Sequence, residues 1–194
     1  LGSGDVPELT VELADLATLF DEARRRTRHH EYVVMGSLSV LGVLDPGRLP
    51  ARMLVSIDVD CFARQDPGRI FELGSELGQG SAFEAEHGFY LDPIAPELPT
   101  LPGNWRNRLV RIPLDNGIVV FFLDPNDAAV SKYARGEPRD REWIRAGLGA
   151  GVLNAGVIAS RFRETDFLDD DERSRAEAAL GEDRALRRPT SAGS

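Results

Sequence analysis

The stretch Ser56-Ile57-Asp58-Val59-Asp60 alternates polar and apolar residues inside a run that predicts a β-strand over 53–62. Residues two apart on a strand point to the same face, so Asp58 and Asp60 lie side by side, with Ser56 beside them. Two adjacent carboxylates repel each other unless solvent or a cation relieves them. Mg²⁺ binds one or two carboxylates together with phosphate oxygens, and such a pair can orient a triphosphate. The stretch is therefore either the water-facing side of a half-exposed strand or a metal site.

Upstream, an apolar run over 32–35 predicts a buried strand that leads into Gly36 and Ser37. A glycine and a hydroxyl at the point where a strand turns into a helix can seat a phosphate. The glycine lets the backbone come close, and the helix N-terminus offers free N–H groups. The alternative is an ordinary turn in which Ser37 caps a helix expected over 38–44.

Downstream, Asp124-Pro125 is a helix start, with aspartate as N-cap and proline at the first helical position. This helix carries Lys132, the one lysine among 23 basic residues. A compact ammonium suits a phosphate oxygen. The next helix begins at Pro138 and carries Asp140 in its first turn. The alternative is a surface helix pair with a solvated lysine and an aspartate that favours the helix dipole.

The order of elements predicts an α+β fold, in which a small mixed sheet with flanking helices is followed by a helical C-terminal half. Strands are expected over 32–35, 53–62 and 88–91 and in a hairpin over 108–113 and 118–123, whose turn is Asp115-Asn116-Gly117. We expect an α/β core over 1–123, helices packed on it over 124–186, and a disordered tail over 187–194.

The charge balance of the 194-residue chain is acidic, because 32 acidic residues outweigh 23 basic ones and leave a net charge of −9. This excludes a nucleic-acid binder that is basic throughout and leaves only local arginine patches. The single cysteine, Cys61, cannot form an internal disulfide, which favours a reducing cytoplasm. No apolar run reaches about 18 residues, so we expect a cytoplasmic protein with no membrane partner.

The Gly-Ser pair after the first core strand, followed by Asp-x-Asp on the next, resembles the nucleotidyltransferase fold of the polymerase-β-like enzymes. The segment over 123–140 is similar to the "Asp-Leu-x-x-x-Lys-Leu … Arg-x-x-Lys-Asp" helix pair of its abortive-infection (AbiEii-like) branch, which includes MenT-type toxins. The stretch over 56–60 is similar to the Ser-x-Asp-x-Asp motif of that branch. The resemblance covers about residues 33–163.

The resemblance implies a role for each matching residue. Gly36, Ser37 and Ser56 would bind the nucleotide, and Asp58 and Asp60 would bind the metal. Lys132 would contact phosphate, and Asp140 would lie at the catalytic centre as an acid/base or positioning carboxylate. The implied activity is Mg²⁺-dependent transfer of a nucleoside monophosphate from an NTP to an acceptor hydroxyl. The implied setting is a toxin that acts on tRNA 3′ ends and has a cognate antitoxin.

The sequence departs from that pattern in three ways. It has Gly-Ser where Gly-Gly is common, and the long gap between Ser37 and Asp58 suggests an inserted loop near 45–52. No third metal carboxylate is evident on the strand expected over 118–123. The last departure favours the alternative function, a catalytically inactive nucleotide-binding or protein-interaction module on the same fold, whereas the retained Asp58, Asp60 and Lys132 disfavour it.

An RNA acceptor would need a basic patch in this acidic chain. Arg139 and Arg141, which flank Asp140, are the candidate RNA contacts. A second group of arginines can gather beside the site from the loops around it: Arg52, Arg106, Arg108 and Arg111.

Overall fold

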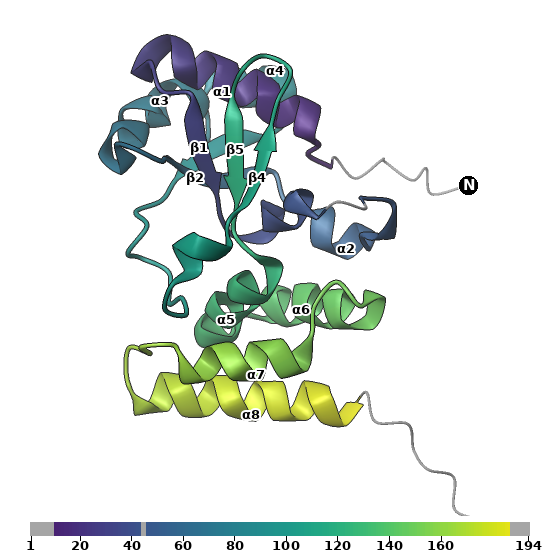
Figure 1. Cartoon of the computed structure of the whole chain (residues 1–194). Coiled ribbons are helices and arrows are strands. Elements are labelled where there is room, and N and C mark those ends of the chain that lie inside the picture. The colour runs from purple at the N-terminus through teal and green to yellow at the C-terminus, as the bar shows by residue number, and fades with distance from the viewer. Residues whose placement is uncertain (1–9, 44–45, 187–194) are drawn as a thin grey trace, which may run out of the picture.

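The computed structural model describes residues 10–43 and 46–186 of the chain. The tail expected over 187–194 lies outside these described residues. The fold has two layers: a mixed sheet with its helices, and below it a stack formed by the four C-terminal helices (Figure 1). The expected α+β architecture is confirmed.

The sheet has five strands in the order β3-β2-β1-β5-β4. The central strand β1 pairs antiparallel with β2 and parallel with β5, and the edge strand β3 pairs parallel with β2. The other edge strand, β4, forms the expected hairpin with β5. The strand bounds are β1 Glu31–Val34, β2 Asp58–Ala63, β3 Tyr90–Pro93, β4 Val110–Pro113 and β5 Val119–Phe122.

Helix α1 covers the sheet through an apolar face that includes Leu16, Leu19 and Phe20. The ring of Phe20 stacks on Tyr32 of β1, with the ring centroids 4.4 Å apart. The other helices of this layer are short, and several are 3₁₀ turns. The helix bounds are α1 Leu13–Thr27, η1 Ser37–Gly42, η2 Pro46–Arg48, α2 Ala51–Leu54, η3 Pro67–Leu73, α3 Gly74–Leu77, α4 Ala82–His87 and η4 Trp105–Arg108.

The helical layer consists of α5 Pro125–Arg135, α6 Pro138–Ala150, α7 Ala155–Arg163 and α8 Asp170–Leu186 (Figure 1). Asp124 caps α5 as expected, because its carboxylate accepts from the N–H groups of Asn126 and Asp127. The buried carboxylate of Asp183 on α8 accepts hydrogen bonds from Tyr133, Arg141 and Arg145. These bonds hold α8 against α5 and α6.

The prediction of a strand over 53–62 is wrong at its start. Residues 51–54 form the short helix α2, and β2 begins only at Asp58. The side chain of Met53 is buried and packs close to Gly147 of α6, where an added Cβ would approach its methyl group to 2.8 Å. A helical turn places Met53 in this contact. The inserted loop expected near 45–52 contains η2 and part of α2, and its residue 45 lies outside the described residues.

The two-part division at residue 123 remains a prediction. In the described part of the chain, no helix combines the length and apolar character that crossing a bilayer requires.

Candidate active site

Three carboxylates meet where β2 and β3 run side by side. Asp58 and Asp60 lie on β2, and the parallel register places Asp92 of β3 opposite Asp60. One carboxylate oxygen from each residue lies within 4.8 Å of the others, and all three residues are half-buried. We call Asp58, Asp60 and Asp92 the acidic triad. Its third member, Asp92, was not predicted from the sequence, because a third carboxylate was expected on the strand over 118–123.

The acidic triad concentrates negative charge in a site with restricted access to water. Burial, and then the charges of Asp58 and Asp92, raise the pKa of Asp60 from 3.8 to about 7. Burial and the charge of Asp58 also raise the pKa of Asp92. A divalent cation would relieve this repulsion, and a donor set made only of carboxylate oxygens suits Mg²⁺. The hydroxyl of Ser56 donates a hydrogen bond to Asp58 and so orients that carboxylate.

The Gly-Ser turn after β1 lies against the triad. Gly36 has a φ of +58°, and a Cβ added there would sit 1.9 Å from Oδ2 of Asp60. Only glycine fits at this point without moving the carboxylate. The N–H of Met35 donates to the backbone oxygen of Asp60 at 2.8 Å, which fixes the turn to β2. The helix expected over 38–44 is the 3₁₀ helix η1.

Lys132 reaches from α5 to this turn and is only 5% exposed. Its ammonium donates to Oγ of Ser37 at 2.9 Å and to Oδ1 of Asp140 at 3.2 Å. It also lies 4.9 Å from the ring centroid of Trp143. Burial lowers the pKa of Lys132, while Asp140 acts in the opposite direction. The lysine therefore lies between the Gly-Ser turn and the helical layer, and the solvated-surface alternative for it is wrong.

Asp140 is fully buried and is shared by two cations. Arg135 donates to both of its oxygens, at 2.8 and 2.6 Å, and Lys132 to one of them. Burial alone would raise the pKa of Asp140, but the hydrogen bonds from Arg135 and the charge of Lys132 outweigh it and lower that pKa. An ionised, doubly bound carboxylate suits a positioning role better than proton transfer. Sequence reasoning missed Arg135 as its partner, because the helix break at Gly136 separates the two residues.

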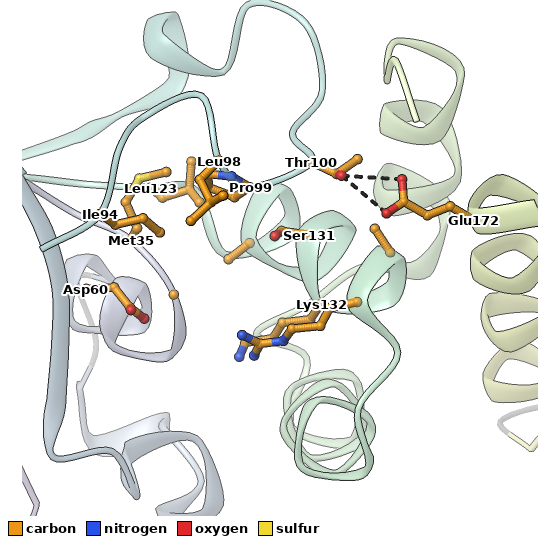
Figure 2. A pocket seen from close by; sticks show the side chains of 14 residues that line it. Met35, Asp60, Ile94, Leu98, Pro99, Thr100, Leu123, Ser131, Lys132 and Glu172 are labelled. Atoms are coloured by element: carbon orange, nitrogen blue, oxygen red, sulfur yellow. Dashed lines mark hydrogen bonds between the residues drawn. The ribbon is translucent and has the colours of Figure 1, made fainter. Parts of the chain in front are cut away.

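Two cavities meet at this cluster, and Asp60, Lys132 and Arg135 line both. The first, about 430 Å³, is the polar chamber, lined by the acidic triad, Ser37, Ser56, Arg52 and Arg139, among others. The second, about 340 Å³, is the apolar chamber, and Figure 2 shows it with Asp60 and Lys132 at its edge. Its apolar walls come from Met35, Ile94, Leu98, Pro99, Leu123 and Ala128.

The structure brings together every residue that the resemblance placed at the site: Gly36, Ser37, Ser56, Asp58, Asp60, Lys132 and Asp140. They come from η1, β2, α5 and α6, with Gly36 in the turn after β1 and Ser56 just before β2. The roles of the individual residues in a reaction remain predictions.

The expected arginine patches need correction. Arg52 and Arg139 line the polar chamber. Arg141 instead turns to α8, where it donates to Asp183 at 3.0 Å and to Glu182 at 3.1 Å. Its place as an RNA contact beside Arg139 is therefore not supported, because its guanidinium is used to dock α8.

Three further arginines also lie elsewhere. Arg108 donates to the buried carboxylate of Asp127 at 2.7 Å, and Arg106 lies over the ring of Trp105. Arg111 belongs to β4, the edge strand opposite β3. None of these three arginines lines either chamber, so the structure does not support their gathering beside the site.

The model of a family described as nucleotidyltransferases of unknown function (DUF6036) matches residues 12–182, a range that includes every residue that lines the two chambers. The search of curated proteins and the search of solved structures each returned no match.

Proposed function

The chain belongs to the family of nucleotidyltransferases of unknown function (DUF6036), and we propose that it uses the acidic triad and Mg²⁺ to transfer a nucleoside monophosphate from an NTP to an acceptor hydroxyl. The observation that carries this proposal is the third carboxylate, Asp92, beside Asp58 and Asp60. Three carboxylates held together at a half-buried sheet edge are costly to the folded chain unless they bind a cation.

Asp92 also weighs against the alternative of an inactive module. That alternative was favoured by the absence of a third metal carboxylate in the sequence pattern, and β3 supplies one. An inactive module would not require all three carboxylates, nor Gly36 in contact with Asp60, nor the buried Lys132 beside them.

The acidic triad would hold the metal, and when bound the metal supplies positive charge to the triphosphate oxygens. The acceptor oxygen attacks the α-phosphorus, and the bond from the α-phosphorus to the bridging oxygen of pyrophosphate breaks. Pyrophosphate leaves, and the proton of the hydroxyl passes to a triad carboxylate. Catalysis of this kind depends mainly on positioning and charge stabilisation.

The surrounding residues would hold the triphosphate in place. The absence of a side chain at Gly36 lets the phosphates approach the triad, and Ser37 offers a hydroxyl. Lys132 and Arg135 present positive charge at the boundary between the chambers, where they would bind the α-phosphate. Asp140 keeps both cations in position.

The acceptor and biological setting are proposed from the resemblance to the AbiEii-like and MenT-type branch. We propose an RNA 3′ hydroxyl, such as that of a tRNA, as acceptor, and a toxin whose partner is a cognate antitoxin. Arg139 supports an RNA acceptor, because it lines the polar chamber and its side chain is 66% exposed.

The test of the enzymatic proposal is a transfer assay. The full chain, Mg²⁺, total RNA and each NTP labelled at the α-phosphate should give labelled RNA and release pyrophosphate. Asp92→Asn should remove the activity, while the matched Asp115→Asn, an exposed site in the β4–β5 turn, should retain it. Mg²⁺-dependent NTP binding without transfer to any acceptor would favour the inactive module, and absence of both would contradict the proposal.

The test of the RNA acceptor uses charge reversal. Arg139→Glu should weaken RNA binding more than NTP binding, and RNA affinity should fall steeply with salt, because each neutralised phosphate releases counterions. Arg111→Glu, the same charge change on the exposed strand β4, is the control. Salt-independent binding, or equal RNA affinity in all three proteins, would argue for a protein or small-molecule acceptor.

A further inference from the structure

The apolar chamber is a second, differently built compartment next to the triad. Its near end is formed by Asp60, Lys132 and Arg135, and its walls are mostly aliphatic. At its far end the hydroxyl of Thr100 donates to the carboxylate of Glu172, at 3.3 Å to Oε2 (Figure 2). The chamber is thus polar at both ends and apolar between them.

The segment that follows β3 closes this chamber. Two residues after Asp92 the chain lines the cavity with Ile94, and it then crosses to the helical layer. There Thr100 bonds Glu172, Pro102 forms a β-bridge with Thr165, and the N–H of Gly103 donates to the oxygen of Glu164 at 2.7 Å. These contacts hold the wall at a fixed position relative to the triad.

The size and charge of the chamber select among the groups that a nucleotidyltransferase must bind. A volume of about 340 Å³ lies at the lower end of small-molecule pockets, about 300–1,000 Å³, and suits one nucleoside-sized group rather than a polymer. The carboxylate of Glu172 repels phosphates, so an RNA chain is a poor occupant. A neutral, planar ring with N–H donors at its far edge fits both the walls and Glu172.

We propose that the apolar chamber binds the nucleobase of the NTP and that Glu172, held by Thr100, selects a base with an exocyclic amino group. This inference rests on the proposed function. It places the base in the apolar chamber and the α-phosphate at the boundary, beside Lys132 and Arg135. The rest of the triphosphate then lies in the polar chamber.

The selection follows from the hydrogen-bonding character of Glu172. Its Oε2 accepts from the backbone N–H of Leu168 at 2.8 Å and from Thr100, and an ionised carboxylate has no donor. Guanine, adenine and cytosine carry an amino donor, whereas the 4-position of uracil carries an acceptor oxygen. A uracil carbonyl facing this carboxylate would be repelled.

The first experiment tests the place of the base. Ser131 lines the chamber, and Ser131→Leu would fill part of it. We expect Mg²⁺-dependent NTP binding to weaken at least about tenfold, or roughly 1.4 kcal/mol, while binding of inorganic tripolyphosphate stays within about twofold. The exposed Ser174→Leu on α8 is the matched control. Equal affinity of wild type and Ser131→Leu for NTP would overturn the inference and leave the proposed function standing.

The second experiment tests the selection. Wild type should bind CTP at least about tenfold tighter than UTP, and GTP tighter than ITP, which lacks the 2-amino group. Glu172→Gln, which adds an amide donor, should reduce both preferences, while Glu177→Gln on the exposed side of α8 should keep them. Unchanged preferences in Glu172→Gln, or tighter UTP binding by wild type, would overturn the role of Glu172. Failure of the folded wild type to bind any NTP would instead contradict the proposed function.

Discussion

Replacing Asp60 by asparagine should stabilise the metal-free protein while removing its activity. Burial and the other two triad carboxylates raise the pKa of Asp60 from 3.8 to about 7. Between pH 3.8 and about pH 7, the folded chain therefore keeps a proton on Asp60 that the unfolded chain releases. Its stability falls as pH rises through that window, since a folded-state pKa above the unfolded value penalises the ionised form.

The magnitude follows from the two pKa values. Each pKa unit corresponds to about 1.36 kcal/mol, so relative to the unfolded chain Asp60 costs the folded state at most roughly 4 kcal/mol at pH 8, where it is ionised, and about 1.6 kcal/mol at pH 5, where it keeps its proton. An asparagine never ionises, but burying its amide without full hydrogen bonding costs about 1–2 kcal/mol. The net gain of Asp60→Asn should be about 2–3 kcal/mol at pH 8 and near zero at pH 5.

The assay is urea and thermal unfolding of wild type and variant at both pH values in the presence of a chelator. For a chain of this size the gain at pH 8 corresponds to roughly 5–10 °C in Tm. Added Mg²⁺ should then raise the Tm of wild type and leave the variant unchanged, because a ligand that binds only the folded state stabilises it. The exposed Asp66→Asn serves as the control. A variant that is less stable than wild type at pH 8, or a gain that is equal at both pH values, would refute the reasoning.

Three further changes test the surroundings of the triad. Lys132→Arg should lower the transfer rate at least about tenfold, because a planar guanidinium does not fit the space between Ser37 and Asp140; wild-type turnover would show that the lysine only supplies charge. Gly36→Ala should lower both Tm and Mg²⁺ affinity, measured by calorimetry, because its Cβ meets Oδ2 of Asp60; unchanged affinity would mean that the turn can move away. Asp140→Asn should destabilise the fold by about 3 kcal/mol in urea unfolding, since it leaves Lys132 buried without its anionic partner, and a silent substitution would refute the positioning role.

The sequence predicted those parts of the site that depend on local pattern. Alternation placed Asp58 and Asp60 on one face, the Asp115-Asn116-Gly117 turn marked the hairpin, and Asp124 marked the start of α5. Each of these signals lies within a few residues of the feature that it indicates. The structure contains all three features: the shared face, the hairpin and the start of α5.

The parts that were missed depend on partners distant in the chain. Asp92 joins the triad only because β3 pairs parallel with β2, a register that nothing local in the sequence determines. The apolar run that ends in Asp92-Pro93 indicates a strand. It does not indicate which strand would pair with it in the sheet. Met53 followed the strand alternation but lies in a helix, because burial against Gly147 of α6 outweighs the local pattern.

The order of the site residues along the chain has a consequence during synthesis. A nascent chain that has emerged as far as Asp92 already carries the whole acidic triad, but the lysine that faces it lies on α5. That helix is held by α8 through Tyr133 and the buried Asp183, close to the end of the described residues. The ammonium of Lys132 is thus held opposite the carboxylates only after α8 has been synthesised. An unfinished chain carries the negative charges of the site before the lysine is positioned beside them.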